Sequence, residues 1–290
     1  MRWLGLWLAA CSTGEQPASE APDPRLEGPA DVDVVRLTMD LGDRDGFPPQ
    51  VPVAAYLPDG AAFEGARPPV VWFSGTAGAA PEAWHESLVH LSSWGVVVLA
   101  PTWDSVANPR SHQGLADDLT AAVAWLRSTP VEGVDPDPDR QGAAGLGRGA
   151  KVAALAAAAA GLDALWLADP DDTAAQEGPE WPSAIGLGGL PITALVGTGG
   201  DEANPPCVDG TVGYDAYVPA AAWSWRLGDA GGADLVDQCV QGRGGLVCAC
   251  GLGARPGEAL TAARGWQAAF FRATLASDAA MEPLLDEAWY

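Results

Sequence analysis

The stretch that decides the fold runs from Gln141 to Ala160 and reads QGAAGLGRGAKVAALAAAAA. Its first residues, Gln141–Leu146, are mostly small or apolar, which is typical of a strand buried on both faces of a parallel sheet. Its second half, Ala150–Ala160, predicts a helix because it is rich in alanine, the residue with the highest helix propensity. Gly145, Gly147 and Gly149 stand at alternate positions between the two halves. Because glycine tolerates backbone conformations that other residues avoid, the stretch predicts a sharp turn from a buried strand into a helix.

The rest of the chain continues this alternation of short apolar strands and longer helices. We expect further strands at Val32–Met39, Val51–Leu57, Pro69–Ser74, Gly95–Ala100, Leu162–Ala168, Ile192–Val196 and Trp223–Leu227, and further helices at Pro81–Trp94, Gln113–Ser128 and Glu258–Leu275. Such alternation predicts an α/β fold, a mostly parallel twisted sheet with helices on both faces. Because no second linker interrupts the pattern, we expect one domain over residues 31–290.

Composition and charge exclude several functional classes. The 290 residues include 38 Asp or Glu and 15 Lys or Arg, which gives a net charge of −23. Proteins that bind nucleic acid gather Lys and Arg to replace the counterions of phosphates, so we expect no nucleic acid among the partners. Gly197–Gly200 lacks the lysine of a phosphate-binding loop, and the three histidines, His85, His90 and His112, are too few for a histidine-rich metal centre. We therefore expect no cofactor and no metal.

The N-terminus has the pattern of an export signal over residues 1–11. An apolar run follows Arg2, and Leu8–Cys11 resembles a bacterial lipobox, whose cysteine is lipidated and becomes the mature N-terminus. The run is too short to span a bilayer, so we expect a lipid anchor at Cys11, and Ser12 after it favours the outer membrane of a bacterial cell envelope. Residues 12–30 predict a disordered tether. The alternative is a disordered apolar tip with an incidental cysteine.

The other four cysteines are Cys207, Cys239, Cys248 and Cys250, an even number that suits disulfides in an exported protein. Cys248 and Cys250 are too close along a strand to pair easily with each other. This leaves Cys207 and Cys239 each bridged to one of that pair, and free thiols are the alternative.

The glycine turn resembles the nucleophile elbow of the α/β-hydrolases, Gly-x-Ser-x-Gly, where a strained strand-to-helix turn exposes a serine hydroxyl. Gly145–Ala150 is similar to the elbow Gly-His-Ser-Arg-Gly-Gly of the chlorophyllase and polyester-hydrolase branch, which is dienelactone-hydrolase-like. Segments that resemble this branch follow in order from about Val51 to Leu275, at Phe73–Gly75, Leu91–Pro101, Leu167–Pro170, Leu195–Gly199, Pro205–Cys207, Gly231–Asp237 and Cys248–Cys250. The resemblance implies an α/β-hydrolase fold and, for an intact site, carboxylic-ester hydrolysis.

The chain departs from this family at the residues that carry the chemistry. The resemblance places Gly147 at the nucleophile position and Gly232 at the position of the catalytic histidine. It assigns the triad acid to Asp169, and Asp201 offers the alternative acid position after the next strand. The expected oxyanion-loop and ligand-binding residues are Ser74, Gly75, Thr76, Arg148, Trp103 and Trp181. The two tryptophans follow strand ends on the side where ligands bind in such sheets, with core or lid packing as the alternative.

A triad rebuilt from other residues is the competing interpretation. The hydrolase triad runs Ser, acid, His along the chain, yet all three histidines precede the glycine turn. Ser74 is the candidate for an unconventional nucleophile, although its place matches the oxyanion loop. We expect His112 to be a solvated loop residue, and His85 and His90 to pack on a helix.

These observations predict a lipid-anchored protein of the α/β-hydrolase fold that is non-catalytic. We expect it to bind an apolar or ester-like ligand, or a protein partner, in the former active-site cleft. The alternatives are an active carboxylic-ester hydrolase with a non-standard constellation and a structural lipoprotein of the envelope.

Overall fold

A single sheet of eight strands organises the described part of the chain. The computed structural model describes residues 22–59, 67–75, 81–103, 110–131, 133–170, 192–199, 217, 221–228, 230, 232–237 and 256–286. The strands are β1 (Val32–Asp40), β2 (Gln50–Pro58), β3 (Val70–Ser74), β4 (Val97–Pro101), β5 (Gln141–Leu146), β6 (Ala164–Ala168), β7 (Thr193–Gly199) and β8 (Trp223–Leu227). Their order across the sheet is β1-β2-β4-β3-β5-β6-β7-β8. β1 pairs antiparallel with β2 and β2 with β4, whereas the pairs from β4 through β8 are parallel.

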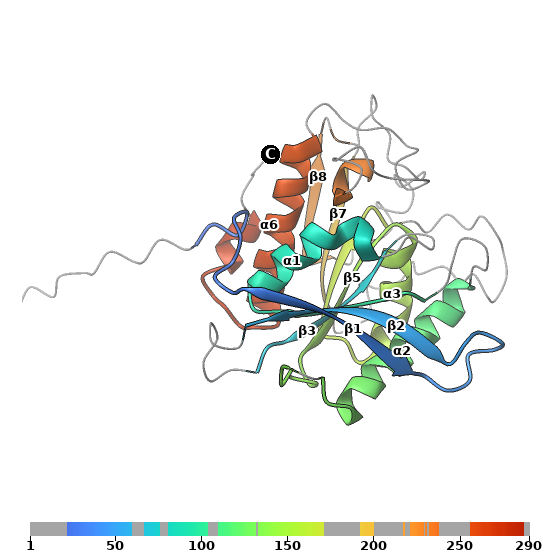
Figure 1. The fold of residues 1–290 in the computed structure, drawn as a ribbon. Helices are drawn as coiled ribbons and strands as arrows, with labels where there is room; N and C mark the ends of the chain where they lie inside the picture. Colours follow the sequence, from blue (N-terminus) through green and yellow to red (C-terminus); the bar gives the residue numbers. More distant parts are fainter. Residues whose placement is uncertain are drawn as a thin grey trace, which may run out of the picture.

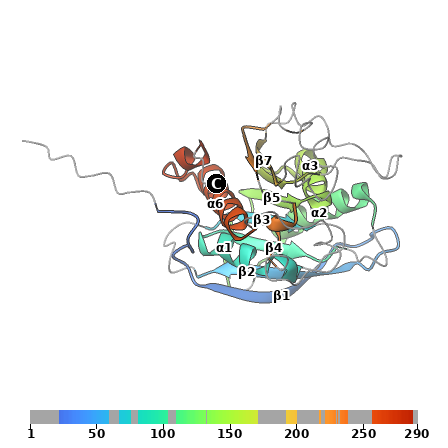
Figure 2. The same ribbon diagram turned by 90° about the horizontal axis from the view of Figure 1, so that it is seen from above.

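Helices cover both faces of this sheet. The helices are α1 (His85–Ser93), α2 (His112–Ser128), α3 (Arg148–Ala160) and α6 (Pro256–Thr274), with short 3₁₀ turns at Pro81–Trp84, Gly232–Leu235 and Glu282–Asp286. Figures 1 and 2 show α1 and α6 on one face and α2 and α3 on the other. The predicted α/β class, with a mostly parallel sheet and helices on both faces, is confirmed.

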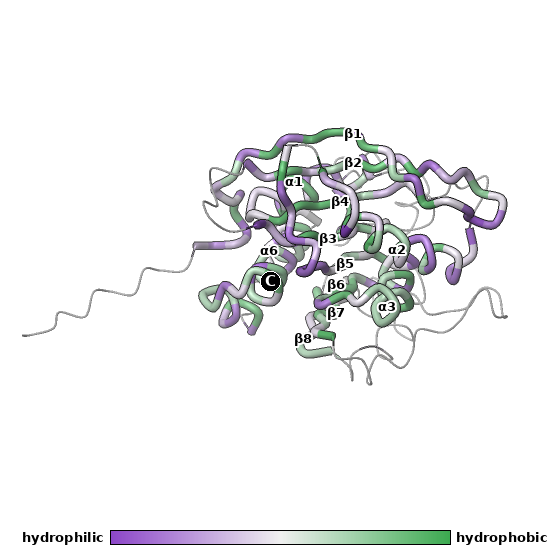
Figure 3. Tube along the Cα trace, turned by 90° about the horizontal axis from the view of Figure 1, so that it is seen from below, coloured by the Kyte–Doolittle hydropathy of each residue, from purple (hydrophilic) through white to green (hydrophobic). Residues whose placement is uncertain are grey.

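Each face of the sheet has its own hydrophobic core, because successive side chains of a strand point to opposite faces. Val70 and Trp72 of β3 pack in the cluster beneath α2 and α3, whereas Val71 and Phe73 pack in the cluster beneath α1 and α6. Figure 3 shows the hydrophobic residues concentrated along the central strands and α3. The central strands are therefore buried on both sides, and their carboxyl ends form the edge where the predicted site residues lie.

The predicted elements agree with the structure apart from their ends. The helix expected over Pro81–Trp94 begins as a 3₁₀ turn at Pro81–Trp84 and becomes α1 only at His85. α3 begins at Arg148, two residues before the predicted Ala150, because Gly147 itself serves as the N-cap residue. The alanine-rich pattern indicated the helix body, whereas the backbone conformation of the turn sets its first residue.

The predicted tether over residues 12–30 is wrong for residues 22–30, which pack against the end of α1. The amide of Ala30 donates to the carbonyl oxygen of Ser93 at 3.1 Å. The indole Nε1 of Trp94 donates to the carbonyl oxygen of Leu26 at 3.1 Å. These contacts use backbone atoms of the N-terminal segment, so its composition could not reveal them.

Several predictions concern residues outside the described part of the chain. These residues are the five cysteines, Cys11, Cys207, Cys239, Cys248 and Cys250, and the first part of the predicted tether. The lipid anchor and the disulfides therefore stay predictions. Among the described residues, no helix has the length and apolar character needed to cross a membrane.

Candidate ligand site at the glycine turn

Gly147 occupies a strained turn between β5 and α3. Its φ is 56° and its ψ is −120°, a positive-φ conformation that a side chain makes unfavourable. The amide of Gly147 donates to the carbonyl oxygen of Ala168 at 3.0 Å, and its own carbonyl accepts from the amides of Ala150 and Lys151 at 3.1 and 3.3 Å. The turn is therefore fixed on both sides, by the neighbouring strand β6 and by the first turn of α3.

The flanking glycines permit contacts that no other residue would allow. A Cβ on Gly149 would lie 2.0 Å from the carbonyl oxygen of Ser74 and 2.6 Å from that of Gly75. A Cβ on Gly145 would lie 2.4 Å from the amide nitrogen of Ala150. The start of α3 thus packs directly on the backbone at the end of β3, where the resemblance places the oxyanion loop.

The hydroxyl of Ser74 is held in a buried hydrogen-bond chain. Ser74 is 4% exposed, and its Oγ accepts from the indole Nε1 of Trp103 at 3.1 Å. The carbonyl oxygen of Trp103 accepts from Arg44 at 2.9 Å, and Arg44 pairs with buried Asp118 at 2.6 Å. Arg110 adds a second guanidinium 2.8 Å from the same carboxylate. These hydrogen bonds fix the orientation of the Ser74 hydroxyl, and Trp103 lies in the core beneath α2 and α3.

Asp169 lies at the carboxyl end of β6, beside the glycine turn. It is 2% exposed, with a φ of 44°, and its amide donates to the carbonyl oxygen of Gly197 on β7 at 2.6 Å. Because Gly147 bonds to the residue before Asp169, the structure brings the predicted nucleophile and acid positions to neighbouring strand ends. Asp201, the alternative acid, lies outside the described residues, as do Thr76 and Trp181.

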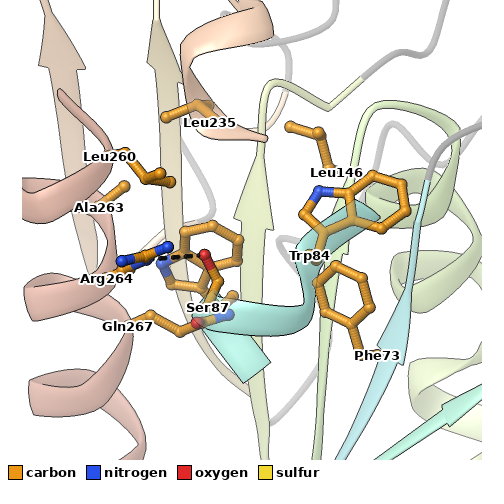
Figure 4. Close-up of a pocket in the computed structure, with 10 residues that line it drawn as sticks. Phe73, Trp84, Ser87, Leu146, Leu235, Leu260, Ala263, Arg264 and Gln267 are labelled. Carbon is orange, nitrogen blue, oxygen red and sulfur yellow. Dashed lines mark hydrogen bonds between the residues drawn. The ribbon is translucent and has the colours of Figure 1, made fainter. Parts of the chain in front are cut away.

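A pocket with a cavity volume of about 20 Å³ borders these segments. Its lining residues are Phe73, Trp84, Ser87, Leu146, Trp166, Leu235, Leu260, Ala263, Arg264 and Gln267 (Figure 4). Phe73 precedes Ser74, Leu146 precedes Gly147, and Leu235 ends the turn that begins at Gly232. The pocket therefore lies against the three segments to which the sequence assigned the oxyanion loop, the nucleophile position and the histidine position.

Sequence patterns do not indicate the polar cluster formed by Ser87, Asp237 and Arg264. Asp237 is 2% exposed; its carboxylate accepts from the amide of Ser87 at 2.8 Å, from the hydroxyl of Ser87, and from Arg264 at 2.9 Å. Arg264 also donates to the hydroxyl of Ser87 at 2.9 Å (Figure 4). The cluster joins α1, α6 and the segment after Leu235. Asp237 closes the Gly231–Asp237 motif, but its partners are 150 and 27 residues away.

The titratable groups near this face have other partners. His90 is 5% exposed and its Nε2 lies 2.8 Å from the carbonyl oxygen of Pro24; burial lowers the pKa of His90. The Nδ1 of His85 lies 3.4 Å from the hydroxyl of Tyr56, and burial raises the pKa of Tyr56 to about 12. The expectation of a solvated His112 is wrong, because the ring is 8% exposed at the start of α2.

Arg148 and Gly75, the other predicted site residues that the structure describes, lie at the same carboxyl edge of the sheet. Arg148 is the first residue of α3, so its amide lies at the positive end of the helix dipole. Gly75 packs against Trp84, since a Cβ there would meet the indole ring at 2.3 Å. No group of three or more His, Cys, Asp or Glu suited to a metal occurs within the described ranges.

Comparisons with known proteins add no family name. No protein-family model matches the chain, and no curated protein matches it.

Proposed function

We propose that this chain is a non-catalytic member of the α/β-hydrolase group, resembling chlorophyllases and polyester hydrolases, that binds an apolar or ester-like ligand at the carboxyl edge of its sheet. The observation that carries the proposal is Gly147. It has the strained backbone of a nucleophile elbow, it is flanked by the close packing of Gly145 and Gly149, and it has no side chain. The backbone of this turn supports the resemblance to a nucleophile elbow, and glycine leaves no side chain where the reacting atom of such an elbow would be.

The loss of two triad positions argues against hydrolysis by the family mechanism. Glycine offers neither a nucleophile nor a proton carrier at position 147 or 232. In a comparable triad, loss of the serine or the histidine alone lowers turnover by roughly 10⁶-fold, and loss of further members adds little. Binding and oxyanion stabilisation can persist without the triad, so ligand binding is the function that this arrangement still supports.

The alternative of an active esterase requires Ser74 to serve as the nucleophile. Its hydroxyl already accepts from Trp103 and is buried at 4% exposure. Attack on an ester would need an exposed hydroxyl and a base within hydrogen-bond reach. This geometry favours the binding function. Export and lipid anchoring at Cys11 stay predictions of the sequence, as does a structural role in the envelope.

The experiment is an assay of the full chain with p-nitrophenyl butyrate, for both hydrolysis and binding. We expect measurable binding by calorimetry and turnover on the order of 10⁶-fold below that of a triad esterase. Turnover that Ser74→Ala abolishes would overturn the proposal, and so would the absence of any binding.

A variant that supplies the two missing side chains is a second test of the same site. Gly147→Ser combined with Gly232→His should restore some esterase activity, with Asp169 as the acid. Gly147→Ser alone is the matched control and should gain little, because triad members act as a unit. An inactive but well-folded double variant would contradict the assignment of these two positions.

A further inference from the structure

Residues 22–30, here called the N-terminal strap, are bound to the last turn of α1 through backbone atoms of the strap. The amide of Gly28 donates to the hydroxyl of Ser93 at 2.8 Å, and the amide of Ala30 donates to the carbonyl oxygen of Ser93 at 3.1 Å. A Cβ on Gly28 would lie 2.3 Å from the same carbonyl oxygen. The backbone of the strap therefore lies directly against the end of the helix.

Few side chains of the N-terminal strap are buried. Pro24 and Ala30 are buried, whereas Leu26 is 64% exposed. Leu26 instead contributes its carbonyl oxygen, which accepts from the indole Nε1 of Trp94 at 3.1 Å. Each such hydrogen bond contributes little net free energy, and segments with few buried apolar contacts open before the rest of a domain. The strap can therefore detach while the sheet and its helices stay folded.

His90 lies beneath the N-terminal strap. Its ring is buried, and its Nε2 lies 2.8 Å from the carbonyl oxygen of Pro24. Burial lowers the pKa of His90, and the charge of Arg264 on α6 lowers it further. The hydrogen bond to Pro24 and the carboxylates of Glu27 and Asp237 act in the opposite direction but do not restore the ordinary pKa. The docked strap therefore favours the neutral imidazole.

Detachment of the strap changes the environment of this ring. Because the carbonyl of Pro24 lies against Nε2, detachment exposes the ring to water, where an imidazole has its ordinary pKa of about 6.5. A proton therefore binds more tightly to the detached form, and by linkage protonation favours detachment. If the docked form stays neutral, the equilibrium constant for detachment rises by up to about 30-fold between pH 7.5 and pH 5.0.

We propose that the N-terminal strap is an acid-released device: it is docked on α1 at neutral pH and detaches as the pH falls because His90 becomes protonated. Release lengthens the free chain that precedes β1 by nine residues, which span about 30 Å when extended. With the predicted lipid anchor at Cys11, acid would thus increase the distance that the domain can move from the membrane.

The test measures amide hydrogen exchange of the full chain by NMR at pH 7.5 and pH 5.0, as protection factors, which correct for the intrinsic effect of pH on exchange. The amides of Gly28 and Ala30 report on the strap. The amide of Leu41, which donates to the carbonyl oxygen of Pro49, is the internal control. We expect protection of Gly28 and Ala30 to fall by up to about 30-fold at pH 5.0, and protection of Leu41 to stay unchanged. Equal protection of the strap at both pH values, or an equal fall at Leu41, would overturn the proposal.

Two histidine variants assign the titrating group. His90→Gln keeps a donor for the carbonyl of Pro24 but does not titrate, so the strap should be equally protected at both pH values. His85→Gln is the matched control, because His85 lies at the other end of α1 beside Tyr56, and it should keep the wild-type fall. A wild-type fall in His90→Gln, or the loss of the fall in His85→Gln, would assign the response to another group and overturn the proposal.

Gly28→Ala tests the reciprocal effect of the strap on His90. The added Cβ meets the carbonyl oxygen of Ser93, so the strap should detach at both pH values and the amide of Ala30 should lose its protection. The pKa of His90, measured from its ring resonances, should then rise to about 6.5. Full protection of Ala30 in this variant would contradict the docking on α1. A detached strap with the pKa of His90 still lowered would show that other elements bury the ring, and would overturn the proposal.

Discussion

Gly149→Ala perturbs the closest backbone contact of the site. The added Cβ would lie 2.0 Å from the carbonyl oxygen of Ser74 and 2.6 Å from that of Gly75. Because these atoms belong to the backbone at the end of central strand β3, that strand or α3 must move by on the order of 1 Å. Overpacking costs ~1–3 kcal/mol, and a backbone contact places the cost near ~3 kcal/mol. The better helix propensity of alanine offsets ~1 kcal/mol, so we expect a net loss of ~2 kcal/mol.

Thermal and urea denaturation, followed by circular dichroism, measure this loss. In a domain of this size a loss of ~2 kcal/mol lowers the Tm by about 4–8 °C. Gly257→Ala is the matched control, because a Cβ near the start of α6 meets nothing within 4 Å. It should leave the free energy of unfolding unchanged or raise it by up to ~1 kcal/mol. A Gly149→Ala variant as stable as the wild type would refute the packing of the glycine turn on β3.

Two further substitutions, Asp237→Asn and His90→Gln, test the surroundings of the site, and Glu82→Gln is the control for the first. Asp237→Asn leaves Arg264 without its buried carboxylate, and breaking a buried ion pair costs ~3–5 kcal/mol. Because the Arg264 side chain is 20% exposed, we expect the free energy of unfolding, measured by urea denaturation, to fall by only about 2–3 kcal/mol. Glu82→Gln breaks the exposed ion pair with Arg36 and should lower the free energy of unfolding by less than ~1 kcal/mol. Equal losses in the two variants would contradict a stabilising role for the cluster of Ser87, Asp237 and Arg264. Burial lowers the pKa of His90 below 6.5, so as the pH falls the unfolded chain is protonated at His90 before the folded chain. The free energy of unfolding therefore decreases below pH 6.5, by at most about 1.4 kcal/mol per pH unit. His90→Gln keeps a donor for the carbonyl of Pro24 and should remove that slope between pH 6.5 and 5; a slope equal to that of the wild type would show that another group titrates.

The helices and strands could be predicted because the apolar pattern that indicates each of them lies within one short segment of the sequence. The run Gln141–Leu146 is buried on both faces, so its apolar character alone identified β5. Residues 22–30 and Asp237 show the opposite case. Their roles depend on hydrogen bonds to α1 and α6, which lie far away in the sequence, and no composition or spacing reports such contacts.

By itself, the sequence determined which residues stand at the two positions that the resemblance assigns to the nucleophile and the histidine. Glycine at 147 and 232 offers neither a nucleophile nor a base, however the chain folds. Only the tertiary structure decided which groups gather around that turn. It placed Trp84 and Trp166 in one pocket, joined Ser74 to Trp103, and set Gly149 against β3. The physical reason is that side-chain chemistry belongs to single residues, whereas burial, hydrogen-bond pairing and close approach depend on residues that only folding brings together.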